Sequence, residues 1–352
     1  MPDTAISVVI ASYNRAHLVG RAIDSALAAM SLGDEMIVAD DGSTDNTQQV
    51  LAQYGSRIRC LRIPHSGVGA ARNYAVRQAR NPLVAFLDDD EWMPDKLQLQ
   101  RAVMHAHPEA LFCFSDFTVR DPLGHVREHN VTRLYRGPCR WEEVLGPGTA
   151  FSSIAPLPAG HADFEVHVAQ LYTTLLEAFY VLTSTVIVRH ELAGAALRFE
   201  EDLPTHEDWV CYARLAKAGP AAYLACSTAC QDKHAGPRVT DADDYTSATA
   251  HIAVLERIWG ADEVFLERQG GRLRQALAKQ HRVRAGWLLR QGRMREAREE
   301  FRLAGEQRLS RRMLACLPGP LAHGLFGLWD MLRCKNPRPE GVALGRPPRG
   351  GR

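Results

Sequence analysis

The first 115 residues alternate between two kinds of segment, and this alternation limits the folds that the chain can adopt. Short apolar runs typical of buried strands alternate with segments of about 10–15 residues that have helical spacing. The expected strands are 6–11, 35–39, 57–63, 83–87 and 111–115, and the expected helices are 18–29, 44–54, 69–79 and 96–107. This order predicts βαβ units, and therefore an α/β fold with a Rossmann-like, mostly parallel sheet flanked by helices.

The rest of the chain is less regular. Residues 122–160 are rich in Gly and Pro, which is typical of a loop, whereas 179–188 and 221–226 are expected to be strands. From residue 247 onward the spacing is helical, and 287–304 indicates one helix-turn-helix. We therefore predict an α/β domain over 1–240, with halves at about 1–115 and 116–240, a helical extension over 247–335 and a disordered basic tail over 336–352.

Charge is unevenly distributed along the chain. The 352 residues carry a formal net charge of +1, which argues against a polyelectrolyte-binding protein, and 46% of them are hydrophobic, enough for one large core and a smaller unit. Residues 308–352 alone carry +7, so the remainder carries −6. A basic tail on an acidic body suggests an anionic surface as a partner for the tail.

The eight cysteines are scattered and form no Cys-x-x-Cys pair, which argues against a zinc site and fits a reduced, cytoplasmic setting. The N-terminus lacks a cationic start followed by a long apolar segment, so no signal peptide is expected. No run of about 18 apolar residues predicts a transmembrane helix.

Acidic residues are crowded directly after the fourth expected strand. Asp88, Asp89, Asp90 and Glu91 follow the apolar run that ends at Leu87. Like charges at such short range raise one another's pKa, and a cation among them relieves the repulsion. Carboxylate oxygens suit Mg²⁺ or Mn²⁺, ions that proteins commonly share with substrate phosphates. The alternative is a solvated acidic turn before the next helix.

Three further polar clusters follow expected strands at the same edge of the sheet, where ligands bind in folds of this kind. Asp41 can accept a hydrogen bond from the imide N–H of a uracil ring, or it can belong to a turn that caps the next helix. Gly69 lets the backbone approach a phosphate closely, and Arg72 can pair with phosphate. Three polar residues follow the first strand: Ser12, Tyr13 and Asn14.

Two clusters occur later in the chain. Glu207 and Asp208 stand just before a helix, where they are either capping carboxylates or a general base facing a cleft. His234 follows an expected strand; imidazole can bind a metal or a diphosphate, although a single loop histidine is more often a surface residue.

The successive motifs resemble those of the family 2 glycosyltransferases. The resemblance covers roughly residues 4–240 and rests on the order and spacing of Val8–Arg15, Val38–Asp45, Gly67–Asn73 and Phe86–Trp92, with Glu207-Asp208-Trp209 similar to a later acid pair. It implies a GT-A fold, a nucleotide-sugar donor, a divalent metal (Mg²⁺ or Mn²⁺) and inversion at the anomeric carbon.

The resemblance also implies roles for individual residues. Tyr13, with Ser12 and Asn14, would lie near the base, Asp41 would accept from uracil N3, and Gly69 and Arg72 would hold the nucleotide. Asp88, Asp89 and Asp90 match the Asp-x-Asp motif, with Asp90 as the direct metal ligand and Asp88 and Asp89 beside metal and nucleotide. Asp208 would be the base, Glu207 its neighbour or substitute, and His234 would lie near the diphosphate and metal. Glu91 departs from the pattern, which usually has Asp there.

The implied function is transfer of a sugar, with a UDP-sugar favoured, to a saccharide or lipid-linked acceptor of surface polysaccharide assembly, in the cytoplasm or at the inner face of the plasma membrane. Residues 313–332 are apolar with arginines on both sides, so they suit either an anionic membrane surface or ordinary helix packing. One alternative is an inactive sugar-nucleotide-binding scaffold. Another is a nucleotidyltransferase, which should have a Gly-rich loop with Arg and Lys after the first strand, where this chain has Ser12 to Arg15.

Overall fold

The computed structural model describes residues 4–135, 140–233 and 241–305. The chain divides into two compact units. The first comprises residues 1–203 and 207–235, and the second comprises 204–206 and 236–352. The domain boundaries predicted from the sequence stay predictions. The same holds for the division of the first domain near residue 115.

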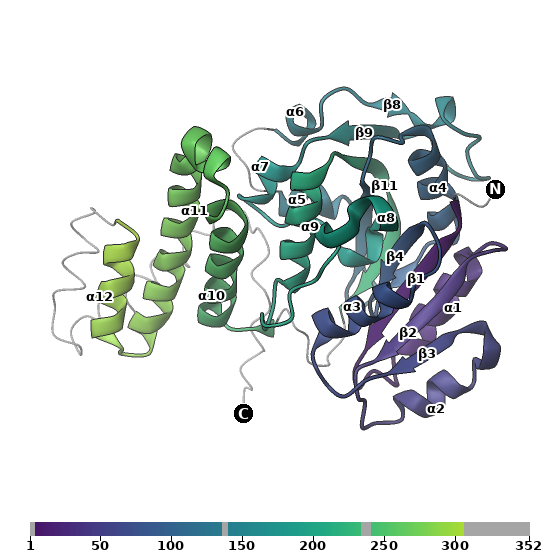
Figure 1. Ribbon diagram of the computed structural model, residues 1–352, viewed down its shortest axis with the longest axis horizontal. Coiled ribbons are helices and arrows are strands. Elements are labelled where there is room, and N and C mark those ends of the chain that lie inside the picture. Colours follow the sequence, from purple (N-terminus) through teal and green to yellow (C-terminus); the bar gives the residue numbers. More distant parts are fainter. Residues whose placement is uncertain (1–3, 136–139, 234–240, 306–352) are drawn as a thin grey trace. The chain divides into compact units, whose positions relative to one another are not determined.

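One mixed sheet forms the centre of the first unit (Figure 1), with strand order β3-β2-β1-β4-β10-β6-β11-β9-β8 and with β5 and β7 paired to β11 and β6. Its strands are β1 Ile6–Ser12, β2 Glu35–Asp40, β3 Arg59–Arg62, β4 Leu83–Leu87, β5 Glu91–Trp92, β6 Phe112–Arg120, β7 Val126–Arg127, β8 Thr149–Ala150, β9 Glu165–Ala169, β10 Ile187–Arg189 and β11 Ala221–Asp232. The pairs β3-β2, β2-β1 and β1-β4 are parallel, as the alternating segments predicted.

Helices connect and cover these strands. They are α1 Val19–Ala29, α2 Thr47–Ala52, α3 Val68–Gln78, α4 Lys96–Ala106, α5 Asn130–Leu134, α6 Trp141–Leu145, α7 Tyr172–Leu175, α8 His190–Ala193 and α9 Glu207–Ala218. Helix α3 packs against β1 and β2, and α4 packs against β6 and β11. Both β1 and β4 are almost wholly buried apolar runs, as expected for central parallel strands. The α/β prediction is confirmed.

Two sequence predictions about the middle of the chain are wrong. The run 179–188 is not one strand, because a 3₁₀ turn at Thr183–Thr185 interrupts it and only Ile187–Arg189 pairs in the sheet. Its β-branched residues are buried by tertiary packing instead, which the local pattern could not distinguish from strand pairing. Residues 122–160 contain β7, α5, α6 and β8 and are therefore not one continuous loop.

The described part of the second unit is helical (Figure 1): α10 Asp244–Leu255, a π-helical turn Glu256–Gly260, α11 Glu263–Arg290 and α12 Met294–Leu303. The expected helix-turn-helix is formed by the end of α11 and by α12, which turn at Gly292 with a positive φ of 73°. A small core joins these helices, formed by Ala285, Leu288, Leu289, Ala297 and Phe301. The predicted basic tail and residues 313–332 lie outside the described residues.

Candidate active site at the carboxyl ends of β1, β2 and β4

Parallel pairing brings the sequence motifs together at one edge of the sheet. Ser12 is in register with Asp40, and the backbone N–H of Asp41 donates to the carbonyl of Ser12 at 2.9 Å. On the other side of β1, Ile10 is in register with Leu87, so the acidic turn begins beside the same edge. Motifs that are far apart in sequence therefore start from three neighbouring strands.

Asp41 is held by the turn that precedes α3. Its Oδ1 accepts from the backbone N–H of Ser66 at 2.8 Å, and its Oδ2 accepts from that of Gly67 at 2.9 Å. The Nδ1 of His65 lies 2.9 Å from the same Oδ2. The His65 ring also stacks on Tyr13, with centroids 3.9 Å apart and planes at 15°. The two residues predicted to receive a base are thus brought together, and His65 contacts both of them.

Asn14 shapes the turn after β1. It has a positive φ of 52°, a conformation that Asn tolerates better than most residues. Its Oδ1 accepts from the backbone N–H of Thr44 at 2.8 Å, which ties this turn to the one after β2. Ser12 lies beside it with only 4% of its surface exposed, and among the described residues its Oγ has no hydrogen-bond partner. A buried hydroxyl without a hydrogen-bond partner is uncommon in a folded protein.

Arg72 connects the acidic turn to the helix that carries the candidate base. Its Nη2 donates to Asp88 Oδ1 at 2.6 Å, and its Nη1 donates to Glu207 Oε1 at 2.8 Å. The guanidinium also lies over the Phe199 ring, 5.0 Å from its centroid. Burial disfavours the charge, but the carboxylates of Asp88 and Glu207 outweigh that effect and raise the pKa of Arg72. Arg72 therefore remains positively charged between the carboxylates of Asp88 and Glu207.

Helix α3 is fastened to the segment before α9 through close contacts. The side chain of Asn73 bonds both backbone groups of Phe199, donating to its carbonyl at 2.9 Å and accepting from its N–H at 2.9 Å. At Gly69, a Cβ atom would lie 2.2 Å from the carbonyl oxygen of Glu200. Gly69 is thus required by packing against a neighbouring backbone, and its predicted approach to phosphate stays a prediction.

The acidic turn is ordered by two residues, Ser184 and Arg15, that were not among the predicted site residues. Ser184 accepts from the backbone N–H of Asp88 at 3.2 Å and donates to Asp90 Oδ2 at 2.6 Å. Arg15 donates to Asp89 Oδ2 at 3.1 Å. Ser184 belongs to the 3₁₀ turn that replaces the expected strand, so no local pattern indicated its role; Arg15 at least adjoins Asn14 in the first motif.

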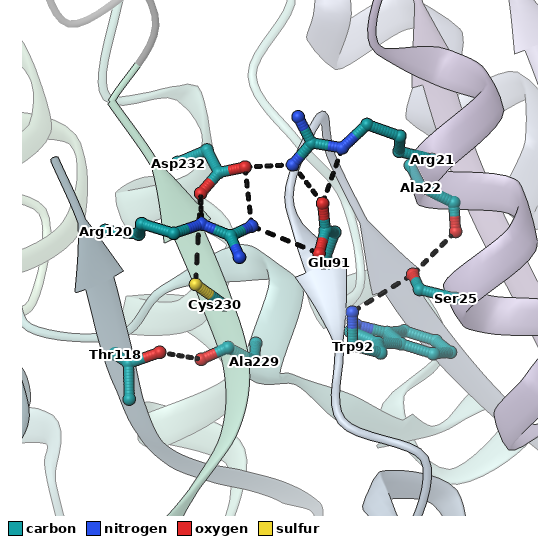
Figure 2. A network of polar contacts seen from close by, with 10 residues as sticks. All are labelled: Arg21, Ala22, Ser25, Glu91, Trp92, Thr118, Arg120, Ala229, Cys230 and Asp232. Carbon is teal, nitrogen blue, oxygen red and sulfur yellow. Dashed lines mark hydrogen bonds and ion pairs between the residues drawn. The ribbon is translucent and has the colours of Figure 1, made fainter. Parts of the chain in front are cut away.

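Glu91 points into a different cluster. It pairs with Arg21 of α1 and with Arg120 of β6, and both arginines also pair with Asp232 at the end of β11 (Figure 2). The Nε of Arg120 lies 2.6 Å from Asp232 Oδ1. Glu91 thus joins β5 to α1 and β6 through ion pairs.

The candidate base lies in the first turn of α9. The Oδ2 of Asp208 accepts from the hydroxyl of Thr183 at 3.2 Å, and its Oδ1 accepts from the backbone N–H of Trp209 at 2.8 Å. Burial and the negative charge of Glu207 raise the pKa of Asp208 to about 7, although Arg72 acts in the opposite direction. A carboxylate with such a pKa is well matched to proton transfer near neutral pH.

Of the three residues predicted to bind a metal, Asp88 and Asp90 lie in the described part of the chain. Asp88 and Asp90 occupy one turn and offer the oxygen ligands that Mg²⁺ or Mn²⁺ takes. No group of three or more His, Cys, Asp or Glu side chains in metal-binding geometry occurs among residues 4–135, 140–233 and 241–305. Mg²⁺ commonly uses only one or two protein carboxylates together with substrate phosphates, so the donor set is chemically suitable. His234 lies outside the described residues.

Within the described ranges, no helix has the length and apolarity needed to cross a bilayer.

Comparison with known proteins supports the fold and the family resemblance. Residues 7–149 match the model for glycosyl transferase family 2. The matched segment makes up less than half of the chain, and over it the chain is similar to that family. The structure resembles that of Staphylococcus aureus TarS 1–349 in complex with UDP-GlcNAc, with a TM-score of 0.56, 18% identity and coverage of 85% of this chain and 79% of TarS. The fold is therefore of the GT-A type, as the motifs implied.

Curated relatives match only part of this chain. An Escherichia coli enzyme, UDP-Glc:alpha-D-GlcNAc-diphosphoundecaprenol beta-1,3-glucosyltransferase WfgD, is 38% identical over 107 residues, which cover 30% of this chain and 42% of the enzyme. The chondroitin synthase of Pasteurella multocida is 37% identical over 98 residues, 27% of this chain and 10% of the synthase. The chain thus spans less than half the length of these relatives.

Proposed function

We propose that this protein is an inverting, metal-dependent glycosyltransferase that transfers a sugar from a nucleoside-diphosphate donor, with a UDP-sugar favoured, to a hydroxyl group of a saccharide or lipid-linked acceptor. The observation that carries the proposal is the bridge made by Arg72. One guanidinium pairs with Asp88 in the donor-side acidic turn and with Glu207 beside the candidate base. The acidic turn proposed to bind the donor and the helix that carries the proposed base are thereby linked through one side chain.

Arg72 has a clear task in such a reaction. Negative charge grows on the diphosphate as the bond to the sugar breaks, and a fixed cation at that place lowers the barrier. The guanidinium is already buried and oriented by two carboxylates, so it needs little reorganisation during the reaction. Mg²⁺ or Mn²⁺ held by Asp88 and Asp90 would supply further charge stabilisation to the same diphosphate.

Asp208 is the proposed base. A pKa raised to about 7 leaves the carboxylate basic enough to take the proton of an acceptor hydroxyl as the new glycosidic bond forms. A single displacement requires one base and inverts the anomeric configuration. The hydrogen bond from Thr183 orients the Asp208 carboxylate, and Glu207 is held by Arg72, which favours Asp208 over Glu207 as the base.

The acceptor class and the location rest on the relatives. The name of the Escherichia coli enzyme specifies a diphosphoundecaprenol-linked acceptor, and the other relative is a polysaccharide synthase. A lipid-linked acceptor for this chain would place the reaction at the inner face of the plasma membrane, with the enzyme as a peripheral cytoplasmic protein.

The first experiment measures binding of UDP, GDP, CDP and dTDP by calorimetry, each with Mn²⁺ and with EDTA. We expect metal-dependent binding of UDP. Turnover is then measured with UDP-sugars and a panel of saccharide and lipid-diphosphate saccharide acceptors, with the anomeric configuration of the product determined by NMR. Binding without turnover would favour an inactive scaffold, and release of pyrophosphate would favour a nucleotidyltransferase. Binding of no nucleotide under any condition would refute the proposal.

A further inference from the structure

His65 makes both of the contacts that are expected of a nucleobase. Its ring stacks on Tyr13 at 3.9 Å between centroids, and its Nδ1 lies 2.9 Å from Asp41 Oδ2. A uracil bound as the motifs imply would lie against the same Tyr13 ring and would donate an N–H to the same carboxylate. The chain therefore contains an internal aromatic ring at the place where the donor's base is expected.

The base and the imidazole cannot hold these contacts together. The ring separation between Tyr13 and His65 is that of direct stacking, so no second ring fits between them. Asp41 is only 2% exposed, and three donors already surround its two oxygens. An incoming base can reach Asp41 only when the His65 side chain leaves.

The surrounding structure allows His65 to leave without disturbing the turn. The turn itself is fixed by backbone groups, since Ser66 and Gly67 donate their N–H groups to Asp41. Gly42 also packs closely on it, because a Cβ there would lie 2.7 Å from the backbone nitrogen of His65. The His65 side chain, in contrast, is 54% exposed. Rotation of this side chain alone would uncover the Tyr13 ring and one face of Asp41.

We propose that the His65 imidazole occupies the nucleobase position of the donor site, and that a nucleotide binds by displacing it. This inference rests on the proposed function, because it requires that Tyr13 and Asp41 receive a base. In the free protein the imidazole stacks on Tyr13 and satisfies Asp41, so the carboxylate is not left with an unused acceptor site. Displacement of the imidazole has a free-energy cost, which lowers the apparent affinity of every nucleotide. The factor is the fraction of the protein in which His65 has left the site.

The test compares nucleotide binding by the wild-type protein and three variants in the presence of Mn²⁺. We expect His65→Ala to bind UDP on the order of tenfold more tightly, because it removes the internal competitor. His65→Phe keeps a ring on Tyr13 but cannot bond Asp41, so its affinity should fall between the two. His125→Ala is the matched control, since His125 bonds Asp121 at 3.0 Å on another loop and should leave the affinity unchanged.

Inorganic pyrophosphate provides a second ligand that has no base. Its affinity should be the same for wild type and His65→Ala, because only the base competes with the imidazole. In the wild-type protein, NMR signals of the His65 imidazole should shift when UDP is added. Circular dichroism checks that each variant is folded, and His65→Phe keeps the inference testable if His65→Ala does not fold.

The outcomes separate this inference from the proposed function. If wild type binds UDP and neither His65 variant binds it more tightly, the displacement model is wrong while the proposed function stands. If the variants gain equally for pyrophosphate, the effect is not at the base position and the model is also wrong. If only the variants bind UDP, both proposals are supported. If no form of the protein binds any nucleotide, both fail.

Discussion

Replacement of Asp208 by Asn should make the protein more stable while abolishing transfer. Burial and the neighbouring Glu207 carboxylate disfavour the charged form of Asp208, which raises its pKa from 3.8 to about 7. An ionised Asp208 is therefore a cost to the folded state, and the proposed role of Asp208 as the base gives a reason for retaining it. Asparagine has nearly the same shape but carries no charge, so the cost disappears together with the basic function.

The size of the effect follows from the two pKa values. At about 1.36 kcal/mol per pH unit, the interval between 3.8 and about 7 sets an upper limit of about 4 kcal/mol. Asp208 is partly exposed and coupled to Glu207, and Arg72 compensates some of the charge, so a gain of about 1–3 kcal/mol is expected.

The dependence on pH has a definite sign. Below pH 4 the carboxyl group is protonated in both folded and unfolded chains, and the variant has no advantage. Between about pH 4 and 7 the unfolded chain loses this proton while the folded protein keeps it, so the wild type becomes progressively less stable than the variant. Above about pH 7 both states are ionised, and the difference reaches a plateau.

Urea unfolding with EDTA, from pH 4.5 to 8.5, measures this difference without the charge of a bound metal. Asp163→Asn serves as a control of opposite sign, because hydrogen bonds from Ser152 lower the pKa of Asp163 and its charge stabilises the fold. A stability difference between wild type and Asp208→Asn that does not grow with pH would refute the electrostatic reasoning. Wild-type turnover by Asp208→Asn would show that Asp208 is not the base.

Three further predictions concern packing, the acidic turn and the metal. Gly69→Ala should lower the free energy of unfolding by about 2–4 kcal/mol, because the added Cβ would collide with the Glu200 carbonyl. Gly286→Ala is the control: its Cβ would meet open space, so it should be neutral or stabilising by up to about 1 kcal/mol. Urea unfolding of both variants checks this prediction, and equal effects would contradict it. Ser184→Ala should weaken Mn²⁺-dependent UDP binding on the order of tenfold or more, since Asp90 loses the hydroxyl that orients it, and unchanged affinity in calorimetry would argue against this role. EDTA should weaken UDP binding and abolish transfer, and Mn²⁺ in excess should restore both; full activity in EDTA would exclude the metal-dependent reaction.

Much of the fold could be predicted from the sequence because strands and helices are indicated by the spacing of apolar residues within short segments. Apolar runs at β1, β2 and β4 and helical spacing between them suffice to predict parallel βαβ units. The same pattern misled at 179–188, where β-branched residues are buried by packing rather than by strand pairing. Which neighbours bury a residue is a tertiary property, so this error could not be avoided from the sequence.

The sequence by itself also determined which chemical groups stand at the sheet edge, because residues that directly follow parallel strands must meet there. Only the tertiary structure decided how they are paired: Arg72 with both Asp88 and Glu207, Ser184 with Asp90, and His65 with Asp41. These partners are separated by 16 to 135 residues. Side-chain pairing over such separations depends on which elements pack together and at what distance, and no local spacing encodes that.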